Sequence, residues 1–477
     1  MNRQPATKDI LQEPSAEASL RIAHLLSHAI YAASLALMIL ATIAYGGSDP
    51  WWKAVFTTAI FAVSIFAVLE IALSNNPRLP WVRVLWPVFL LVAFSLIQTV
   101  TLSHAAPGAS GIQYPFWNSI SADPYETRIF ALQLLALALL AGLFYRYAST
   151  EPRLRRLIHV VIGLAVASAV FGLLRQTTQH QTGFGLPLLI PEQGYGQFIN
   201  KNHFAYLMEM GMGLSLGLLA AGGVRRDRAL IYLAVLLPMW TALVLSNSRG
   251  ALLAMLAQLV ITVLLFPEAV HDNGQSSGKA WAIIKSPAVR VGLVLSLGVL
   301  CIFGVLWVGG DRLATNIEGA RIEFAAPEES RLGVTRLEIW EATLQLVKNN
   351  PIAGVGMGGY WAAIPRYHDA SGSMTPQQAH NDYLELVASG GIIGVAIFVW
   401  FVVVVFRHAR ANLQSVDSFR RAATFAALIA ITGVAVHSLV DFGLHRMANA
   451  MIFVALIVIA TSKVSRDTKT QNENAAS

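Results

Sequence analysis

Long apolar stretches, separated by short polar segments, run through almost the whole chain. A helix that spans a bilayer needs roughly 20 apolar residues, and windows of about that length recur along this sequence. Two stretches, Val84–Leu102 and Leu386–Phe406, contain no charged residue at all. The pattern predicts twelve membrane-spanning helices, at residues 24–45, 52–73, 82–102, 128–146, 157–176, 203–223, 229–246, 250–266, 290–309, 385–406, 421–441 and 446–462.

The composition agrees with a multi-pass membrane protein. The chain is 55% hydrophobic and 13% charged, whereas a soluble domain carries about 25% charged residues. Its basic residues punctuate the apolar windows instead of clustering, which argues against a nucleic-acid-binding patch. A single cysteine, Cys301, excludes a disulfide framework or a cysteine metal site within one chain.

Lysine and arginine gather at alternate ends of the predicted helices, which sets their orientation. This bias places both termini in the cytoplasm, with polar tails at 1–23 and 463–477. The first window starts too late and is too long for a cleaved signal peptide. We therefore expect an all-α protein of the bacterial inner membrane, with helices one to nine at 24–309 and ten to twelve at 385–462.

The longest segment on the opposite, periplasmic side is a loop at 310–384. A loop of that length needs structure or a function of its own. Leu332, Leu337, Trp340, Leu344 and Val347 recur at helical spacing, and a proline at 351 ends the run. We expect a partly helical loop, with an amphipathic helix at the membrane surface.

A histidine lies where this loop meets the tenth predicted helix. Thr375 reads as an N-cap and Gln378 as the N3 residue of a capping box, which puts His380 in the first helical turns. The positive end of a helix disfavours imidazolium, so His380 is expected to be neutral and able to accept a proton. The alternative is that His380 only marks the interface, hydrogen-bonded to a loop.

Two other patterns are weaker signals. Gly354–Gly359 matches GxGxxG but follows no predicted strand and lies outside the cytoplasm, so it indicates a tight turn with close backbone packing. Asp-x-Asp and Asp-Asp pairs do not occur in the sequence. We therefore expect no cofactor and no metal site on paired carboxylates.

Several cations lie at periplasmic helix starts, against the charge bias. Lys201 opens one predicted helix, Arg249 opens another, and Arg336 lies in the long loop. Arginine can bind phosphate oxygens in a bidentate manner, and lysine adds a point charge. Together they suit a lipid diphosphate, whereas Arg128 at another helix start is better explained as an anchor.

Further polar residues interrupt the apolar windows near the same face. His437, Asp441 and His445 are four residues apart and would share one face of a continuous helix. Their spacing indicates either a functional group or pairing at a helix end. Glu209 lies two turns below Lys201, so it is either the partner of that lysine or a deeper polar contact.

These stretches carry a family resemblance that covers roughly residues 195–450. "TRLEIWEATLQLVKNNPIAGVGMGGY" and "AHNDYLELVASGGIIG" resemble the signature region of the O-antigen ligase and polymerase family. "FINKNHFAYL", "SNSRGALLA" and "HSLVDFGLHRMANA" also resemble segments of it. The resemblance implies a GT-C-like fold and an integral glycosyltransferase that takes a glycan from undecaprenyl diphosphate.

The resemblance also implies roles for particular residues. His380 matches the proposed general base, Arg249 and Arg336 match diphosphate-binding arginines, and Lys201 departs from an arginine common in relatives. Residues that could contact the acceptor or support the base are Asn381, Asp382, Tyr383, His203, His437 and Asp441.

The implied acceptor is lipid A-core for a ligase or a second lipid-linked glycan for a polymerase. A protein O-oligosaccharyltransferase and a lipid-linked-glycan flippase are the alternatives. A flippase should place its polar groups near the bilayer midplane, whereas here they gather at one face. The expected reaction is a metal-independent, inverting displacement, because undecaprenyl diphosphate needs charge neutralisation rather than a strong acid as it leaves.

Overall fold

The computed structural model describes most of the chain. It covers residues 13–77, 82–101, 119–178, 194–269, 299, 335–368 and 375–463. The predicted ninth span (290–309, apart from residue 299), the loop segment 310–334, Cys301 and most of both predicted tails lie outside the described residues.

Helices make up almost all of the regular structure in these ranges. In the first half they are α1 (Glu13–Ile43), α2 (Pro50–Ser74), α3 (Val82–Gln98), α4 (Pro124–Tyr147), α5 (Glu151–Thr178), α6 (Lys201–Ala220), α7 (Ala229–Leu245) and α8 (Arg249–Ala269). The second half adds α11 (Arg336–Asn349), α12 (Tyr360–Ala363), α13 (Asp382–Leu413), α14 (Ser418–His437) and α15 (Met447–Thr461). Short 3₁₀ turns lie at Tyr45–Gly47 (η1), Arg226–Arg228 (η3), Ile364–Arg366 (η5) and Gly443–His445 (η7).

Each predicted span that falls in the described residues coincides with a helix. Within the described ranges six helices, namely α1, α2, α4, α5, α13 and α14, are long and apolar enough to cross a membrane. Shorter apolar helices correspond to α3, α7, α8 and α15. The all-α class of the prediction is therefore confirmed for this part of the chain, while the count of twelve crossings stays a prediction.

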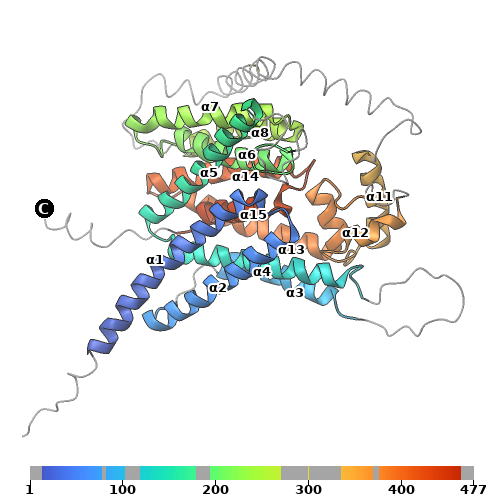
Figure 1. Cartoon of the computed structure of the whole chain (residues 1–477), viewed down its shortest axis with the longest axis horizontal. Coiled ribbons are helices and arrows are strands. Elements are labelled where there is room, and N and C mark those ends of the chain that lie inside the picture. The colour runs from blue at the N-terminus through green and yellow to red at the C-terminus, as the bar shows by residue number, and fades with distance from the viewer. Residues whose placement is uncertain are drawn as a thin grey trace, which may run out of the picture.

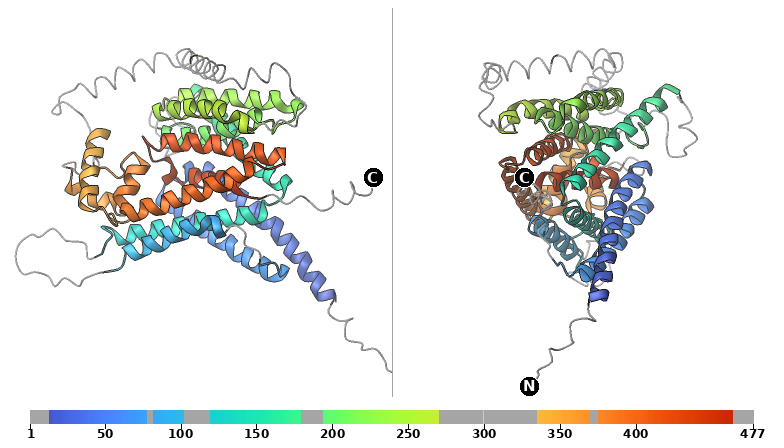
Figure 2. Two further views of the ribbon diagram at one scale, coloured as in Figure 1. Left: turned by 180° about the vertical axis from the view of Figure 1, so that it is seen from behind. Right: turned by 90° about the vertical axis from the view of Figure 1, so that its left-hand side faces the viewer.

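The helices lie side by side in layers (Figures 1 and 2). Helices α7 and α8 form the upper edge of Figure 1 and α2 and α3 the lower edge, while α11 and α12 lie beyond the right-hand end of the bundle. Helix α6 packs closely on α14, because a Cβ at Gly213 would lie 2.5 Å from Cα of Ala430, and one at Gly217 2.3 Å from Cα of Ala426. Small residues of this kind allow membrane helices to approach each other.

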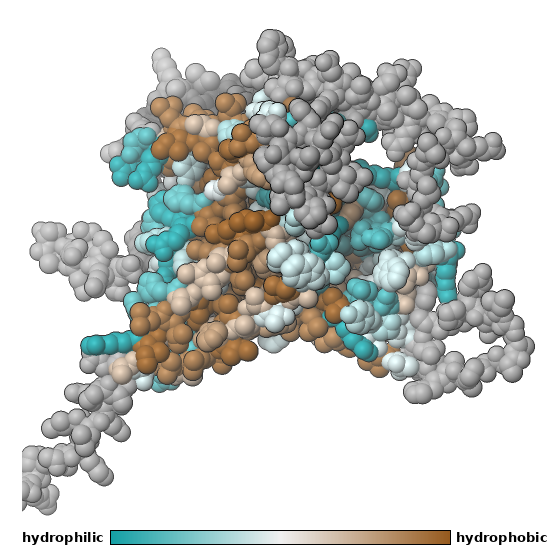
Figure 3. Space-filling view, viewed as in Figure 1, coloured by the Kyte–Doolittle hydropathy of each residue, from teal (hydrophilic) through white to brown (hydrophobic). Residues whose placement is uncertain are grey.

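The outer surface of the bundle is apolar across its width. Large hydrophobic side chains are exposed on α2 (Ile65, Phe66, Val68), α7 (Leu230, Ile231, Leu233) and α13 (Val402, Val403, Phe406). Figure 3 shows a brown, apolar band across one face of the helices, with hydrophilic patches to either side. A soluble monomer rarely exposes apolar surface on this scale, so the bundle is that of a membrane protein.

The glycine-rich turn docks into a break in α13. Gly391 has φ +57° and ψ −160°, which interrupts the helix. Val355 N–H donates to the Ala388 carbonyl at 3.0 Å, and Ile392 N–H donates to the Pro351 carbonyl at 2.9 Å. The predicted tight turn is confirmed: Gly354 has φ +66°, and a Cβ there would lie 2.4 Å from the backbone of Ser389.

Helix α11 coincides with the helix expected in the long loop, but its buried face is another one: Ile339, Ala342 and Leu346 are buried, whereas Leu337 and Leu344 of the predicted face are exposed. Thr335 and Glu338 form a capping box at its start, and it ends at Asn349, two residues before Pro351. The indole N–H of Trp340 donates to the Ala379 carbonyl at 2.9 Å. This bond fixes α11 against the segment that carries His380.

Candidate active site

The starts of α6 and α8 meet the turn that follows α14. Asn202, next to Lys201, donates a short hydrogen bond from its amide to the Asp441 carboxylate. A Cβ at Gly250, next to Arg249, would lie 2.4 Å from the ring of His437. Both predicted diphosphate-binding cations therefore lie beside one turn, residues 438–446, which comes from a distant part of the sequence.

The start of α13 reaches the same turn. The backbone N–H of Asp382 donates to the Ser438 carbonyl at 2.9 Å, and the Ser438 hydroxyl donates to the Asp382 carboxylate at 2.7 Å. The phenol of Tyr383 donates to the Ala435 carbonyl at 2.8 Å. These bonds fasten α13 to α14, so Asp382 and Tyr383 hold His380 in place relative to the turn.

The predicted helix start at Thr375–Gln378 is wrong. Helix α13 begins at Asp382, and Asn381 is its N-cap, because the Asn381 side chain accepts hydrogen bonds from the N–H groups of Tyr383 and Leu384. The N–H of Ala379 instead donates to the Glu385 carboxylate at 2.8 Å. That bond holds residues 375–380 as a loop against the first turns of α13, and Asn381 provides the N-cap of the helix.

His380 therefore precedes the helix and adopts an unusual backbone. Its φ is +50°, a left-handed conformation that few residues other than glycine adopt. Its ring lies edge-on to Phe442, with centroids 4.7 Å apart. Its Nδ1 atom is buried and has no hydrogen-bond partner among the described residues. A strained backbone and an unsatisfied buried nitrogen are features that concentrate at functional sites.

The surroundings of His380 keep its ring neutral. Burial lowers the pKa of His380 below its usual value; the Asp441 carboxylate acts to raise it, and the Arg336 guanidinium acts to lower it. The neutral imidazole predicted from the sequence is thus favoured, although burial is the largest cause rather than the helix end. A neutral imidazole can take a proton from a hydroxyl.

Arg336 and Asp441 form a pair beside this histidine. Nη2 of Arg336 lies 3.5 Å from Oδ2 of Asp441. The carboxylate is 1% exposed, whereas the arginine side chain is 45% exposed. Asp441 also accepts the N–H of Phe442 at 2.8 Å. The carboxylate thus holds one edge of a guanidinium whose remaining surface is accessible.

The expected His437–Asp441–His445 ladder on one helix face is wrong. Helix α14 ends at His437, and His445 lies in η7, so the three residues are on different elements. His437 packs flat on Tyr206, with centroids 4.2 Å apart, and its Nδ1 lies 2.6 Å from Oε1 of Glu209. Glu209 is therefore the partner of His437 and forms the deeper polar contact.

His445 lies edge-on to the Phe442 ring, with centroids 5.8 Å apart. Its Nε2 is 3.4 Å from Oδ1 of Asp382 and 3.8 Å from Oε1 of Glu385. Burial would lower the pKa of His445, but the carboxylates of Glu385 and Asp382 outweigh it and raise the pKa. The two histidines that contact Phe442 are therefore shifted in opposite directions: the pKa of His445 is raised and the pKa of His380 is lowered.

Phe442 and Arg446 are site residues that the sequence reasoning missed. The Phe442 ring also lies edge-on to His203, with centroids 5.1 Å apart, and Arg446 lies over it at 5.5 Å. His203 is buried, and its Nε2 has no hydrogen-bond partner in the described ranges. Arg446 opens α15 as Lys201 opens α6, so the charge argument that identified that lysine applies equally to Arg446.

No metal-binding group is apparent among these residues. Within the described ranges, no three His, Cys, Asp or Glu side chains are grouped as a metal site would require. Each carboxylate near His380 is engaged by protein donors, as Asp441 is by Asn202 and Asp382 by Ser438. The arrangement offers one neutral base, flanking cations and fixed carboxylates.

Comparison with known proteins gives one family match. Residues 234–399 match the family model described as O-antigen ligase, which confirms the resemblance drawn from the motifs. The matched stretch contains Arg249, Arg336 and His380 and ends before His437 and Asp441. A search of the curated proteins finds no match. The family match supports an enzyme of the glycosyltransferase type that transfers glycans as a ligase or a polymerase.

Proposed function

We propose that this chain, whose residues 234–399 carry an O-antigen ligase domain, transfers a glycan from undecaprenyl diphosphate to a sugar hydroxyl at the periplasmic face of the inner membrane. One observation carries the proposal. His380, neutral and partly buried, lies at the end of the bundle where the helices bearing Lys201 and Arg249 begin.

In the proposed reaction His380 acts as the general base. An imidazole nitrogen takes the proton from the acceptor hydroxyl as its oxygen forms a bond to the anomeric carbon of the donor sugar. The bond from that carbon to the diphosphate oxygen breaks, and the diphosphate leaves with the electron pair. Attack from the face opposite the leaving group inverts the anomeric centre.

The cations supply the other half of the chemistry. Lys201, Arg249 and Arg336 would bind the diphosphate and stabilise the charge that grows on it as the glycosyl bond breaks. This requirement can be met by fixed cations, so we propose that the reaction needs no metal ion. Asp441 would orient Arg336, and Asn381 would hold His380 by capping α13 behind it.

The placement of the polar groups favours an enzyme over a flippase. A transporter concentrates its binding groups near the bilayer midplane. Here His380, Arg336 and Asp441 meet where α13 begins, next to α11, which lies beyond the end of the bundle (Figure 1). That position allows contact with a lipid diphosphate and with a glycan outside the membrane.

The test is a transfer assay with the purified full chain in lipid nanodiscs. The donor is an undecaprenyl-diphosphate-linked glycan, offered with lipid A-core, with a second lipid-linked glycan, or with a serine-containing acceptor protein. Transfer to lipid A-core identifies a ligase, chain growth a polymerase, and glycoprotein the oligosaccharyltransferase alternative. Donor that remains intact with all three, together with donor flipping in liposomes, would overturn the proposal.

A deletion strain gives an independent result. Loss of a polymerase should leave single repeats on the acceptor, whereas loss of a ligase should leave glycan on undecaprenyl diphosphate. An unchanged glycolipid profile would contradict both assignments.

A further inference from the structure

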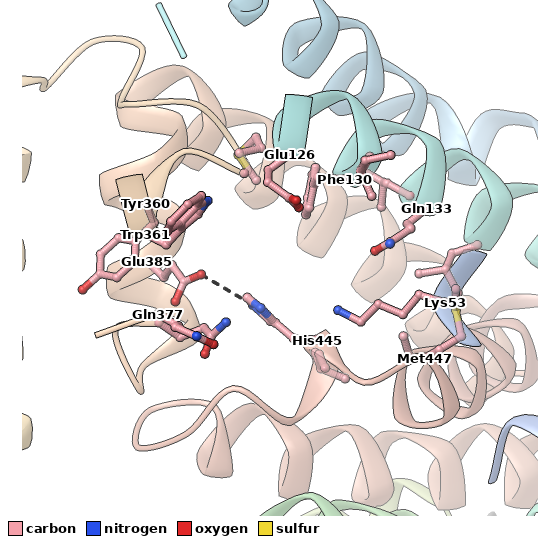
Figure 4. A pocket seen from close by; sticks show the side chains of 18 residues that line it. Lys53, Glu126, Phe130, Gln133, Tyr360, Trp361, Gln377, Glu385, His445 and Met447 are labelled. Carbon is pink, nitrogen blue, oxygen red and sulfur yellow. Dashed lines mark ion pairs between the residues drawn. The ribbon is translucent and has the colours of Figure 1, made fainter. Parts of the chain in front are cut away.

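This end of the bundle also contains a cavity that has no role in the reaction proposed above. It has a volume of about 230 Å³ and lies among the first turns of α2, α4, α13 and α15 (Figure 4). Gln377 and Gln378 line it, and they lie three and two residues before His380. The cavity is thus built partly from the same loop as the proposed base.

Polar side chains face the cavity from opposite walls. Lys53 of α2, Glu126 and Gln133 of α4 point inward on one side, and Glu385 of α13 with Gln377 on the other (Figure 4). Only Glu385 among them has an ion-pair partner, His445, within the described part of the chain. Lys53 and Gln133 are half-buried and Glu126 and Gln377 are exposed, so these polar groups are accessible to a ligand that offers hydrogen bonds.

The charges in the cavity balance. Lys53 and His445 are basic and Glu126 and Glu385 are acidic, so the lining presents both donors and acceptors without a net sign. This differs from the cluster of Lys201, Arg249 and Arg336, which is cationic. A diphosphate would be repelled by the two carboxylates of the cavity, whereas a neutral polyol can accept from the ammonium and donate to the carboxylates.

Aromatic rings complete the lining. Phe130, Tyr360 and Trp361 contribute to it, and Trp361 is 48% exposed. The flat face of an indole suits the C–H face of a sugar ring, which is apolar, while the hydroxyls at the ring edge reach polar side chains. The volume is below the roughly 300–1,000 Å³ of pockets for drug-sized ligands, as expected for one or two sugar rings.

We propose that this cavity is the acceptor subsite, in which Trp361 stacks on a neutral saccharide ring of the acceptor while Lys53, Glu126 and Gln133 bind its hydroxyls. The inference rests on the proposed function and adds where the acceptor is held. A chain of contacts links the cavity to the base, since the rings of His445 and Phe442 are 5.8 Å apart and those of Phe442 and His380 4.7 Å apart. A saccharide seated in the cavity would present the hydroxyl of its next ring to His380.

The first test separates acceptor binding from donor binding. Lys53→Met, in the full chain in nanodiscs, should raise the KM for the acceptor about tenfold or more, as loss of a hydrogen bond to a charged group does. Trp361→Ala should also raise it, because the ring that stacks on the saccharide is lost. The affinity for the donor should be unchanged. Trp51→Ala is the matched control, because Trp51 is on the same helix as Lys53 and is exposed but does not line the cavity. An unchanged acceptor KM, or a parallel loss of donor affinity, overturns the proposal.

The second test reads saccharide binding without any turnover. In a Cys301→Ser background, Gln133→Cys places one thiol on the cavity wall, and its rate of maleimide labelling is measured. The probes are water-soluble core oligosaccharide released from lipopolysaccharide, the free repeat glycan, and undecaprenyl diphosphate. Protection by one of the glycans supports the subsite. Protection by undecaprenyl diphosphate alone, or by none of the three, overturns it.

The two tests also distinguish this inference from the proposed function. If the wild-type chain transfers glycan but the variants keep the wild-type KM, only the subsite fails. If the wild-type chain transfers nothing and a glycan still protects the thiol, the cavity binds saccharide and only the transferase assignment fails.

Discussion

His380 combines a left-handed backbone, a half-buried ring and an unsatisfied Nδ1 atom. Each of these features costs free energy. Asn381, which caps α13, and Asp382, whose N–H donates to the Ser438 carbonyl after α14, hold His380 in this conformation. A purely structural histidine would be expected to satisfy its ring nitrogens. Because Nδ1 is buried, the proton transfer proposed for His380 would use the other ring nitrogen, Nε2.

His380→Ala should lower the rate of transfer by roughly 10²–10⁴-fold, the usual range for a general base, with little change in donor affinity. His380→Gln keeps hydrogen bonding but cannot take a proton at neutral pH, so it should be nearly as impaired. Rate and donor affinity are measured separately for each variant. His24→Ala, at an exposed histidine of α1, is the control. If both His380 variants transfer normally, the base must be sought elsewhere, first at His203 or His437.

The charges around His380 predict the direction of pH effects. The rate should fall as the pH drops through the pKa of His380, which burial holds below its usual value. Arg336 lowers that pKa, so Arg336→Gln should move the acid limb of the pH–rate profile to higher pH. Asp441 raises it, so Asp441→Asn should move the limb to lower pH. Shifts in the same direction for both variants, measured over pH 4–8, would show that the limb belongs to another group.

Arg249→Ala should reduce transfer about 10–100-fold, since a charge-assisted hydrogen bond contributes about 1.5–3 kcal/mol. Lys201→Ala should be less severe, and Lys201→Arg should be tolerated if the role is binding of the diphosphate. The control is Arg225→Ala, an exposed arginine after the far end of α6 that pairs with Asp227. Turnover is measured with protein shown to insert normally. Near-normal activity of Arg249→Ala would remove that residue from the site.

Among the helices, α13 shows how the loop and the bundle are joined. Its break at Gly391 exposes carbonyl groups of the first segment and N–H groups of the second, and the turn at 351–356 bonds to both. Gln98 at the end of α3 adds bonds from its side-chain amide to the carbonyls of Ala353 at 2.7 Å and Ser389 at 3.0 Å. The loop segment that precedes His380 is therefore packed on a rigid support.

Gly391→Ala should destabilise the protein. A backbone conformation reserved for glycine costs about 1–3 kcal/mol when another residue adopts it, and a Cβ at this position would lie 2.3 Å from the Ile352 carbonyl oxygen. Gly163→Ala is the matched control, because a Cβ in that helix meets nothing within 4 Å. Thermal unfolding of the detergent-purified variants gives the comparison. Equal midpoints for Gly391→Ala and the wild type would mean that the break does not support the loop.

For the bundle as a whole, the prediction concerns metal. The sequence contains no Asp-x-Asp or Asp-Asp pair, and fixed cations can neutralise the leaving diphosphate, so turnover should be unaffected by excess EDTA. The assay compares chelated protein with protein supplied with magnesium or manganese. If chelation stops transfer and either ion restores it, the metal-independent mechanism is wrong.

The sequence by itself determined the class of the protein and singled out several residues of the proposed site. Apolar windows locate helices because a bilayer-spanning segment must be apolar along its whole length. The cations at Lys201 and Arg249 were visible because they oppose the charge bias, and His380 because it stands where a polar loop meets an apolar run. The family match over residues 234–399 agrees with that reading.

Only the tertiary structure decided which residues share the site. The Arg336–Asp441 pair and the Glu209–His437 pair each join residues more than 100 positions apart in the chain. The structure also shows that α14 ends at His437, so Asp441 lies in the turn that follows it. Helical spacing placed His437, Asp441 and His445 on one face because periodicity alone cannot detect that the chain leaves the helix. The cavity is likewise built from four helix starts together with loop residues such as Gln377 and Gln378, and no local pattern of residues encodes their meeting.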